Sequence, residues 1–231
     1  MKRQIVLFSV FVILVILGYA LHGDQGTPLN SAVPNENSTQ TLVVEKTPSV
    51  REILISLGSH ESFCWIVNGT SLQVHFFGIQ AKWVKGCVNY ANGSAVYWVK
   101  KTDGRSFHYI VNATLDELDW SVITHTYSPE LNIINFLSWV LTNGNVTEVR
   151  KLGDSYEFHI SLRYVEESNA GTIENPYLIR ILQTWNVTLL VNGDGEPLNG
   201  HFMGRSRGPS NVYGANWFHE GNFTFLGEWK Q

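Results

Sequence analysis

Several patterns that carry chemistry are scarce or absent in this 231-residue sequence. It has only two cysteines and no CxxC, HExxH or phosphate-binding glycine loop, so the motifs of common zinc sites and P-loop enzymes are missing. Charged residues form only 16% of the chain, and a formal net charge of −4 excludes a generally basic nucleic-acid-binding protein. We therefore expect no catalytic residues, no metal or cofactor and no nucleic-acid partner.

Two short polar patterns are interpreted as ordinary surface features. His219-Glu220 could be part of a catalytic dyad, but a lone His-Glu pair at the start of a strand is more often a surface feature without a catalytic role. Asp116, Glu117 and Asp119 could bind calcium weakly, yet an acidic loop is more often simply solvated. The eight histidines show no metal-ligand spacing.

The N-terminus has the pattern of an export signal. Lys2 and Arg3 precede an apolar run from Ile5 to about Leu17 that continues to Leu21, which predicts the cytoplasmic side at residue 1. Cleavage after a small-x-small site at 18–20 would give a secreted protein, whereas an uncleaved segment 1–21 is just long enough to span a membrane. Both outcomes stay open, and both place the rest of the chain outside the cell. No cysteine follows the run, so a bacterial lipid anchor is excluded.

Asn-x-Ser/Thr sequons are enriched in the remainder of the chain. About three are expected by chance, whereas the sequence has seven, none with proline in the middle position. They begin at Asn37, Asn68, Asn92, Asn112, Asn145, Asn186 and Asn222. An excess of sequons behind an export signal indicates a glycan-coated surface protein. Residues 22–46, rich in Gly, Pro, Ser, Thr and Asn, are expected to form a flexible glycosylated stalk.

A single domain over 47–231 is predicted to combine helices and antiparallel strands. Thr47-Pro48 begins a helix that ends at Gly58, and Ser128-Pro129 begins a second helix that ends at Asn143-Gly144. Three Xaa-Gly hairpin signals, at 68–69, 92–93 and 103–104, predict a five-stranded meander with strands near 62–67, 70–77, 82–90, 95–101 and 105–111. Alternating residues predict further strands near 156–164, 183–191, 198–206 and 221–229.

One face of this sheet is predicted to be an aromatic ladder. With two-residue turns, Trp65 would lie beside Leu72, then Cys87, Trp98 and Tyr109 on successive strands. Residues expected to line an apolar site on this face are Trp65, Leu72, Trp98, Phe107, Tyr109, Phe158, Phe223 and Phe225. Lys85 and Lys100 fall on the same face in this register, which implies an edge or an opening near them. The sequons at Asn186 and Asn222 fall on the opposite, solvent-facing side, because alternate residues of a strand point to opposite faces.

The two cysteines give conflicting signals. Outside the cytoplasm a single pair usually forms a disulfide, which favours a bond between Cys64 and Cys87. The predicted register instead places the two residues two strands apart and on opposite faces, beyond bridging distance. Either the register shifts through a bulge or both thiols are free.

The order of elements resembles a known family. The entry segment SVREILISLGSHESFCWIVNG (49–69), the antiparallel strands, the mid-chain helix and the late hairpin NVTLLVNGDGEPLNGHF (186–202) are similar to the lipoprotein-carrier half-barrels, the LolA-like proteins and related mycobacterial lipoproteins. The resemblance implies an α+β fold in which a strongly curved antiparallel sheet of about 8–11 strands is covered on its concave apolar face by two or three helices. It also implies a cavity for lipid or acyl chains. The absence of the lipidation cysteine and the many sequons suggest an archaeal cell-surface relative.

Three functions are consistent with these observations. The domain could bind a lipid or another apolar ligand on its curved sheet. It could be a structural or adhesive envelope glycoprotein without a small ligand, or an extracellular hydrolase whose carboxylates are not recognised. Excess interior volume would favour the first, a filled core the second, and carboxylates converging in a cleft the third.

Overall fold

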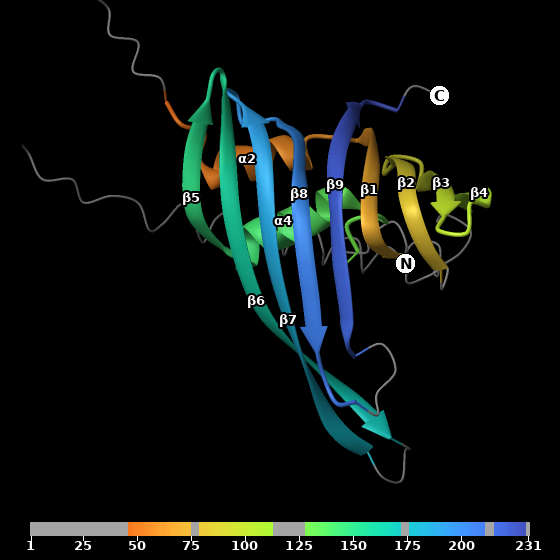
Figure 1. Ribbon diagram of the computed structural model, residues 1–231. Coiled ribbons are helices and arrows are strands. Elements are labelled where there is room, and N and C mark those ends of the chain that lie inside the picture. The colour runs from red at the N-terminus through yellow and green to blue at the C-terminus, as the bar shows by residue number, and fades with distance from the viewer. Residues whose placement is uncertain (1–45, 75–78, 113–127, 172–175, 211–214, 230–231) are drawn as a thin grey trace, which may run out of the picture. The chain divides into compact units, whose positions relative to one another are not determined.

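Nine antiparallel strands form one open sheet in the part of the chain that the structure describes (Figure 1). This computed structural model describes residues 46–74, 79–112, 128–171, 176–210 and 215–229. All of them belong to one compact unit, Glu45–Gln231. The strand order is β4-β3-β2-β1-β9-β8-β7-β6-β5, so β4 and β5 are the two edges and the sheet does not close on itself. The predicted export segment and, except for Lys46, the predicted stalk lie outside the described residues.

Two helices accompany the strands in the described ranges. In chain order the elements are α2 (Val50–Gly58), β1 (Ser62–Val74), β2 (Ile79–Asn89), β3 (Ser94–Lys101), β4 (Ser106–Asn112), α4 (Ile133–Asn143), β5 (Asn145–Leu152), β6 (Ser155–Gly171), β7 (Pro176–Asn192), β8 (Pro197–Arg207) and β9 (Trp217–Gly227). The predicted α+β class with a single antiparallel sheet is therefore confirmed.

The sheet consists of two groups of strands that are consecutive in the chain, and β9 joins the two groups. Strands β1–β4 form one meander and β5–β9 form the other. The link is the ladder between β1 and β9, in which Trp65 lies opposite Phe225 and Val67 opposite Phe223. Strands from the two ends of the domain thus meet in the middle of the sheet.

Alternation along the strands gives the sheet two distinct faces. We call the inner face the one that carries Trp65, Tyr97 and Trp185, all 0% exposed, and the outer face the one that carries Cys64, Asn186 and Arg205. Both helices contribute to the same core as the inner face, α2 through Ile53 and Leu57 and α4 chiefly through aromatic and branched residues. The apolar spacing of both sequences explains why each helix buries one side.

Helix α2 starts two residues later than Thr47. Ser49 is its N-cap and forms a capping box, in which the Ser49 side chain accepts from the Glu52 N–H at 3.2 Å and the Glu52 carboxylate accepts from the Ser49 N–H at 2.7 Å. The helix ends at Gly58, as predicted.

Helix α4 starts at Ile133 rather than at Ser128, because Asn132 provides the cap. The Asn132 side chain accepts from the Asn135 N–H at 3.0 Å and donates to the Tyr90 hydroxyl at 2.7 Å. Residues 128–131 are a turn whose carbonyl groups are held by the sheet. Trp65 Nε1–H donates to the Glu130 carbonyl at 3.2 Å, and the Tyr97 hydroxyl donates to the Leu131 carbonyl at 2.8 Å. The inner face therefore fixes the point where α4 begins.

The predicted hairpin turn at Asn68-Gly69 is wrong. Residues 62–74 form a single strand with a register shift between Asn68 and Leu72, so the first meander has four strands and not five. A Cβ on Gly69 would lie 2.2 Å from the Glu220 carbonyl oxygen, so this glycine is explained by the close approach of β9. The other two hairpin turns are confirmed, with positive φ at Gly93 (64°) and Gly104 (88°).

The second meander is larger than predicted. Strand β5 was not expected, because all eight of its residues are exposed and it has no apolar alternation. Strands β6 and β7 each have 17 residues and pair along their whole length, from Ser155 with Asn192 to Gly171 with Pro176. Figure 1 shows this hairpin extending beyond the ends of β8 and β9.

Candidate functional site

The inner face holds most of the residues predicted to line an apolar site, but they are packed in the core. Trp65, Leu72, Phe158 and Phe223 are between 0% and 2% exposed. Phe107, Tyr109 and Phe225 are partly buried against the same cluster. None of these seven residues lines either of the two surface pockets described below.

Trp98 does not belong to this face, contrary to the prediction. Trp65 lies opposite Gly86, which lies opposite Tyr97, so Tyr97 occupies the place in the ladder that was assigned to Trp98. Trp98 is on the outer face, where Lys85 Nζ lies 5.0 Å from its ring centroid. An edge or opening was predicted near Lys85 and Lys100 to explain two lysines on the inner face. Both lysines lie on the outer face instead, so they do not indicate an opening.

Aromatic side chains of α4 fill the space above the second meander. The Phe136 ring centroid lies 4.8 Å from that of Trp185 and 5.8 Å from that of Phe202. Trp139 contacts both Tyr164 and Trp185 edge-on, at 5.6 and 6.5 Å. Edge-to-face packing of this kind fills volume densely and stabilises a single arrangement of the rings.

One acidic side chain is buried in this core. Glu130 is 0% exposed, and neither of its carboxylate oxygens has a hydrogen-bond partner on another described residue. Burial disfavours the charged form and raises the pKa of Glu130 to about 8, so the side chain is mainly protonated at neutral pH. An uncharged carboxyl group is tolerated there far better than a carboxylate would be.

The His219-Glu220 pair is divided between the two faces. His219 is 0% exposed, with its ring centroid 4.8 Å from that of Trp217, and it is therefore not the surface residue that was expected. Glu220 is on the outer face, where its carboxylate lies 3.6 Å from His201. The two side chains point in opposite directions and cannot act on one substrate. The other polar pattern, Asp116, Glu117 and Asp119, lies outside the described residues.

Cys64 and Cys87 form a disulfide on the outer face. They are direct cross-strand partners on β1 and β2, with their Cα atoms 4.1 Å apart. The predicted register, which separated them by two strands, is wrong because β1 continues through Asn68-Gly69. Of the two alternatives, a register shift through a bulge is confirmed, and free thiols at Cys64 and Cys87 are wrong.

The sequon asparagines share one property, exposure. Six of the seven lie within the described residues, and all six are exposed: Asn68, Asn92, Asn112, Asn145, Asn186 and Asn222. Asn92 is in the β2–β3 turn, and the other five project from the outer side of strands. Exposure is not general for asparagine in this domain, since Asn132 is fully buried. The inner face carries no sequon among the described residues, and Asn37 lies outside them.

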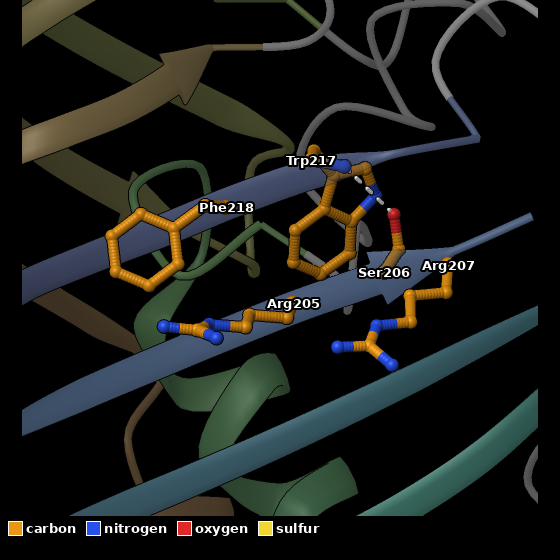
Figure 2. A pocket seen from close by; sticks show the side chains of 5 residues that line it. All are labelled: Arg205, Ser206, Arg207, Trp217 and Phe218. Atoms are coloured by element: carbon orange, nitrogen blue, oxygen red, sulfur yellow. Dashed lines mark hydrogen bonds between the residues drawn. The ribbon is translucent and has the colours of Figure 1, made fainter. Parts of the chain in front are cut away.

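The outer face also has two adjoining pockets around a pair of arginines. Arg205 and Arg207 line both pockets, whose volumes are about 410 and 350 Å³. The larger pocket lies over β7 and β8 and is completed by Leu182, Thr184, Asn186 and Met203. The smaller one lies between β8 and β9 and is completed by Ser206, Trp217 and Phe218. Figure 2 shows the Arg205 guanidinium group extending toward the Phe218 ring and Arg207 lying farther along β8.

The arrangement of these arginines follows from the backbone. Arg205 and Arg207 are two residues apart on β8 and therefore share a face. Between the two arginines in the sequence, Ser206 Oγ accepts from the Trp217 N–H at 3.0 Å and donates to the Ala215 carbonyl at 2.8 Å. These two hydrogen bonds connect the start of β9 to β8. This site was not predicted from the sequence. The Arg-Ser-Arg alternation at the end of a predicted strand does indicate two arginines on one face.

Other kinds of site are not found in the described ranges. They contain no group of three or more His, Cys, Asp or Glu side chains placed to hold a metal ion. None of their helices has the length and hydrophobicity needed to cross a membrane. No protein-family model matches the sequence, and no curated protein is significantly similar to it.

Proposed function

We propose that this chain is an exported, N-glycosylated cell-surface protein whose sheet domain lies outside the cell as a structural or adhesive module. The observation that carries the proposal is the position of the sequons. All six described sequon asparagines are exposed, and each lies on the outer face or in a turn. Glycans attached there would cover one face of the sheet and leave the core undisturbed.

The sheet edges add support. Asn112 is the last residue of edge strand β4, and Asn145 is the first residue of edge strand β5. Exposed edges invite pairing with another chain, and natural proteins obstruct them with bulky or charged groups. A glycan at each edge would have this effect. The Cys64–Cys87 disulfide is also typical of proteins outside the cytoplasm.

A filled core favours the structural or adhesive role over transport of a small ligand. Trp65, Trp185 and Phe223 are buried to within a few per cent, and the rings of α4 pack directly on Trp185. A carrier needs an apolar cavity of several hundred Å³ for its ligand. The two pockets described above are instead lined by Arg205 and Arg207, outside this core.

Lipid or acyl-chain binding in a LolA-like half-barrel is the second candidate. It is favoured by the partial burial of Phe107, Tyr109 and Phe225, which border the core and could contact an apolar chain. In this proposal the sheet is strongly curved and the two helices cover its concave face. Native mass spectrometry of the purified protein after incubation with a lipid extract tests it. Retained lipid would support a carrier, and its complete absence would remove this candidate.

Intact-mass spectrometry of the full chain, purified from the surface fraction of its native host, tests the main proposal. We expect mass in excess of the polypeptide, reduced stepwise when Asn68, Asn186 or Asn222 is changed to Gln. Asn199→Gln is the matched control, because Asn199 is also exposed on the sheet but is followed by Gly200-His201 and forms no sequon. A mass equal to the bare polypeptide, or a chain found only inside the cell, would refute the proposal.

A further inference from the structure

We infer that the arginine pocket on the outer face binds acidic saccharides, that is, sugar units bearing carboxylate or sulfate groups. The arginine pocket is defined by Arg205, Arg207 and Arg163 with the residues between them. Arg163 on β6 lies opposite Thr184 on β7, which in turn lies opposite Arg205 on β8. Neighbouring strands are about 4.8 Å apart, so Arg163 and Arg205 flank Thr184 at a separation of about 10 Å. All three arginines are exposed.

These arginines differ from most others in the domain by having no acidic partner. Arg105 pairs with Asp103 at 2.6 Å, Arg150 with Glu148 at 2.6 Å and Arg180 with Glu167 at 2.7 Å. No ion pair with a described carboxylate joins Arg163, Arg205 or Arg207. A concentration of unneutralised positive charge is unusual in a chain with a formal net charge of −4. It would attract an anionic ligand to this part of the sheet.

The chemistry of the pocket suits an anion attached to a carbon ring. A guanidinium group can donate two parallel hydrogen bonds to a carboxylate or sulfate, which gives it geometric selectivity over a lysine ammonium. The Arg205 guanidinium carbon lies 5.1 Å from the centre of the Phe218 ring, and this contact restricts its orientation. Thr184 supplies a hydroxyl group that can bind a sugar hydroxyl, while Leu182 and Met203 supply apolar surface for the C–H face of a sugar.

Two other anionic partners fit less well. Nucleic-acid binding depends on a basic stripe with many phosphate contacts, whereas this site has three arginines on an acidic protein. Recognition of an anionic membrane surface typically uses clusters of about 4–8 Lys or Arg residues, whereas this site has three arginines.

This inference goes beyond the proposed function and does not require any sequon to be used. The test therefore uses the full-length chain, made in a host without N-glycosylation and kept in detergent. Loss of saccharide binding can then be distinguished from absence of glycosylation, because this protein carries no glycans. Isothermal titration calorimetry would measure binding of an oligogalacturonate, a sulfated dextran oligosaccharide and neutral dextran. A single-stranded DNA and vesicles with an anionic phospholipid provide the two competing classes.

We expect binding of at least one acidic saccharide, with affinity falling about tenfold in Arg205→Ala and to a similar extent in Arg205→Lys, which keeps the charge but loses the forked donor. Arg51→Ala is the matched control, because Arg51 is an exposed arginine on α2 and its loss changes the net charge equally. Its affinity should stay within about twofold of wild type. Unchanged thermal unfolding of each variant would show that the fold is intact.

Three results would overturn the inference. The first is no binding of either acidic saccharide. The second is an equal loss of affinity in Arg51→Ala and Arg205→Ala, which would indicate a general charge effect. The third is tighter binding of DNA or of the vesicles than of the saccharides, which would assign the arginine pocket to one of those partners.

Discussion

The indole ring of Trp65 lies over Gly86, its direct neighbour on β2. A Cβ on Gly86 would lie 2.2 Å from Cζ2 of Trp65, so only glycine leaves space for the ring. Trp185 repeats the arrangement over Gly204, where a Cβ would lie 2.4 Å from the indole. Each buried tryptophan therefore covers a glycine on the adjacent strand, and the two pairs anchor the two meanders of the sheet.

Substitution of Gly86 by alanine should destabilise the domain by about 1–3 kcal/mol or more, because the added methyl group must displace a buried indole that also donates to the Glu130 carbonyl. Urea unfolding followed by tryptophan fluorescence would measure the change. Gly58→Ala is the control, since a Cβ there meets nothing within 4 Å. It should be neutral or stabilising by up to about 1 kcal/mol. Equal unfolding midpoints for the two variants would contradict this account of Trp65.

Stability should fall as pH rises above the usual range of a glutamate. Unfolded Glu130 ionises near 4.5, whereas the folded pKa is raised to about 8 by burial, so the folded state binds more protons between these values. The free energy of unfolding should therefore decrease by about 1.4 kcal/mol per pH unit across this window from this residue alone.

Glu130→Gln removes the ionisation and preserves the shape, so its stability should be less dependent on pH between 5 and 8. Urea titrations at each pH unit would compare it with wild type. The carboxylates of Glu52 and Asp103 do not interfere, because their hydrogen-bonded partners lower both pKa values to about 2. Parallel stability curves for wild type and variant would show that Glu130 is not buried as an acid.

Loss of the disulfide should cost about 3 kcal/mol, the value expected from loop closure for a separation of 23 residues. The double substitution Cys64→Ala and Cys87→Ala would be compared with wild type by thermal unfolding. Dithiothreitol should lower the melting temperature of wild type to a similar extent and leave the double variant unchanged. A wild-type protein whose unfolding is insensitive to the reductant would argue against the bond.

Glycans at the two sheet edges should limit self-association. Removing the sequons of β4 and β5 with Asn112→Gln and Asn145→Gln should increase dimers and larger species, because exposed apolar residues lie on these strands, including Ile110 at 65% and Val149 at 40% exposed. Light scattering coupled to size-exclusion chromatography would measure the change. Asn186→Gln with Asn222→Gln removes two sequons from central strands and should leave the degree of association unchanged. Equal association in both double variants would mean that edge position is unimportant.

Local signals predicted most of the elements, and a long-range contact explains the main error. The alternation of Tyr156, Phe158 and Ile160 identifies a strand, and the positive φ of Gly93 and Gly104 matches two predicted turns. Asn68-Gly69 carries the same turn signal but lies within β1, because its glycine is required by the backbone of β9. Nothing local to residue 69 indicates that a strand from the end of the domain passes beside it.

Two local irregularities changed the predicted site. The turn expected at Gly69 separated Cys64 from Cys87 by an extra strand. The register shift between Ala81 and Trp83, which was not predicted, places Gly86 and Tyr97 on the inner face and Trp98 on the outer face. The aromatic residues of the second meander were placed correctly because their faces depend only on alternation. The pockets around Arg205 depend on which strands are neighbours, and pairing of β7, β8 and β9 brings their lining residues together.

Strand β9 follows all other described strands in the chain, yet it lies in the middle of the sheet. Until residues 217–227 are in place, β1 and β8 each lack a neighbour, and the two meanders are separate sheets with open edges. Pairing Trp65 with Phe225 then joins distant parts of the chain, which is the slow kind of contact in folding. Assembly of this domain therefore waits for its final strand, and a shortened chain would be an aggregation-prone pair of fragments instead of a smaller working protein.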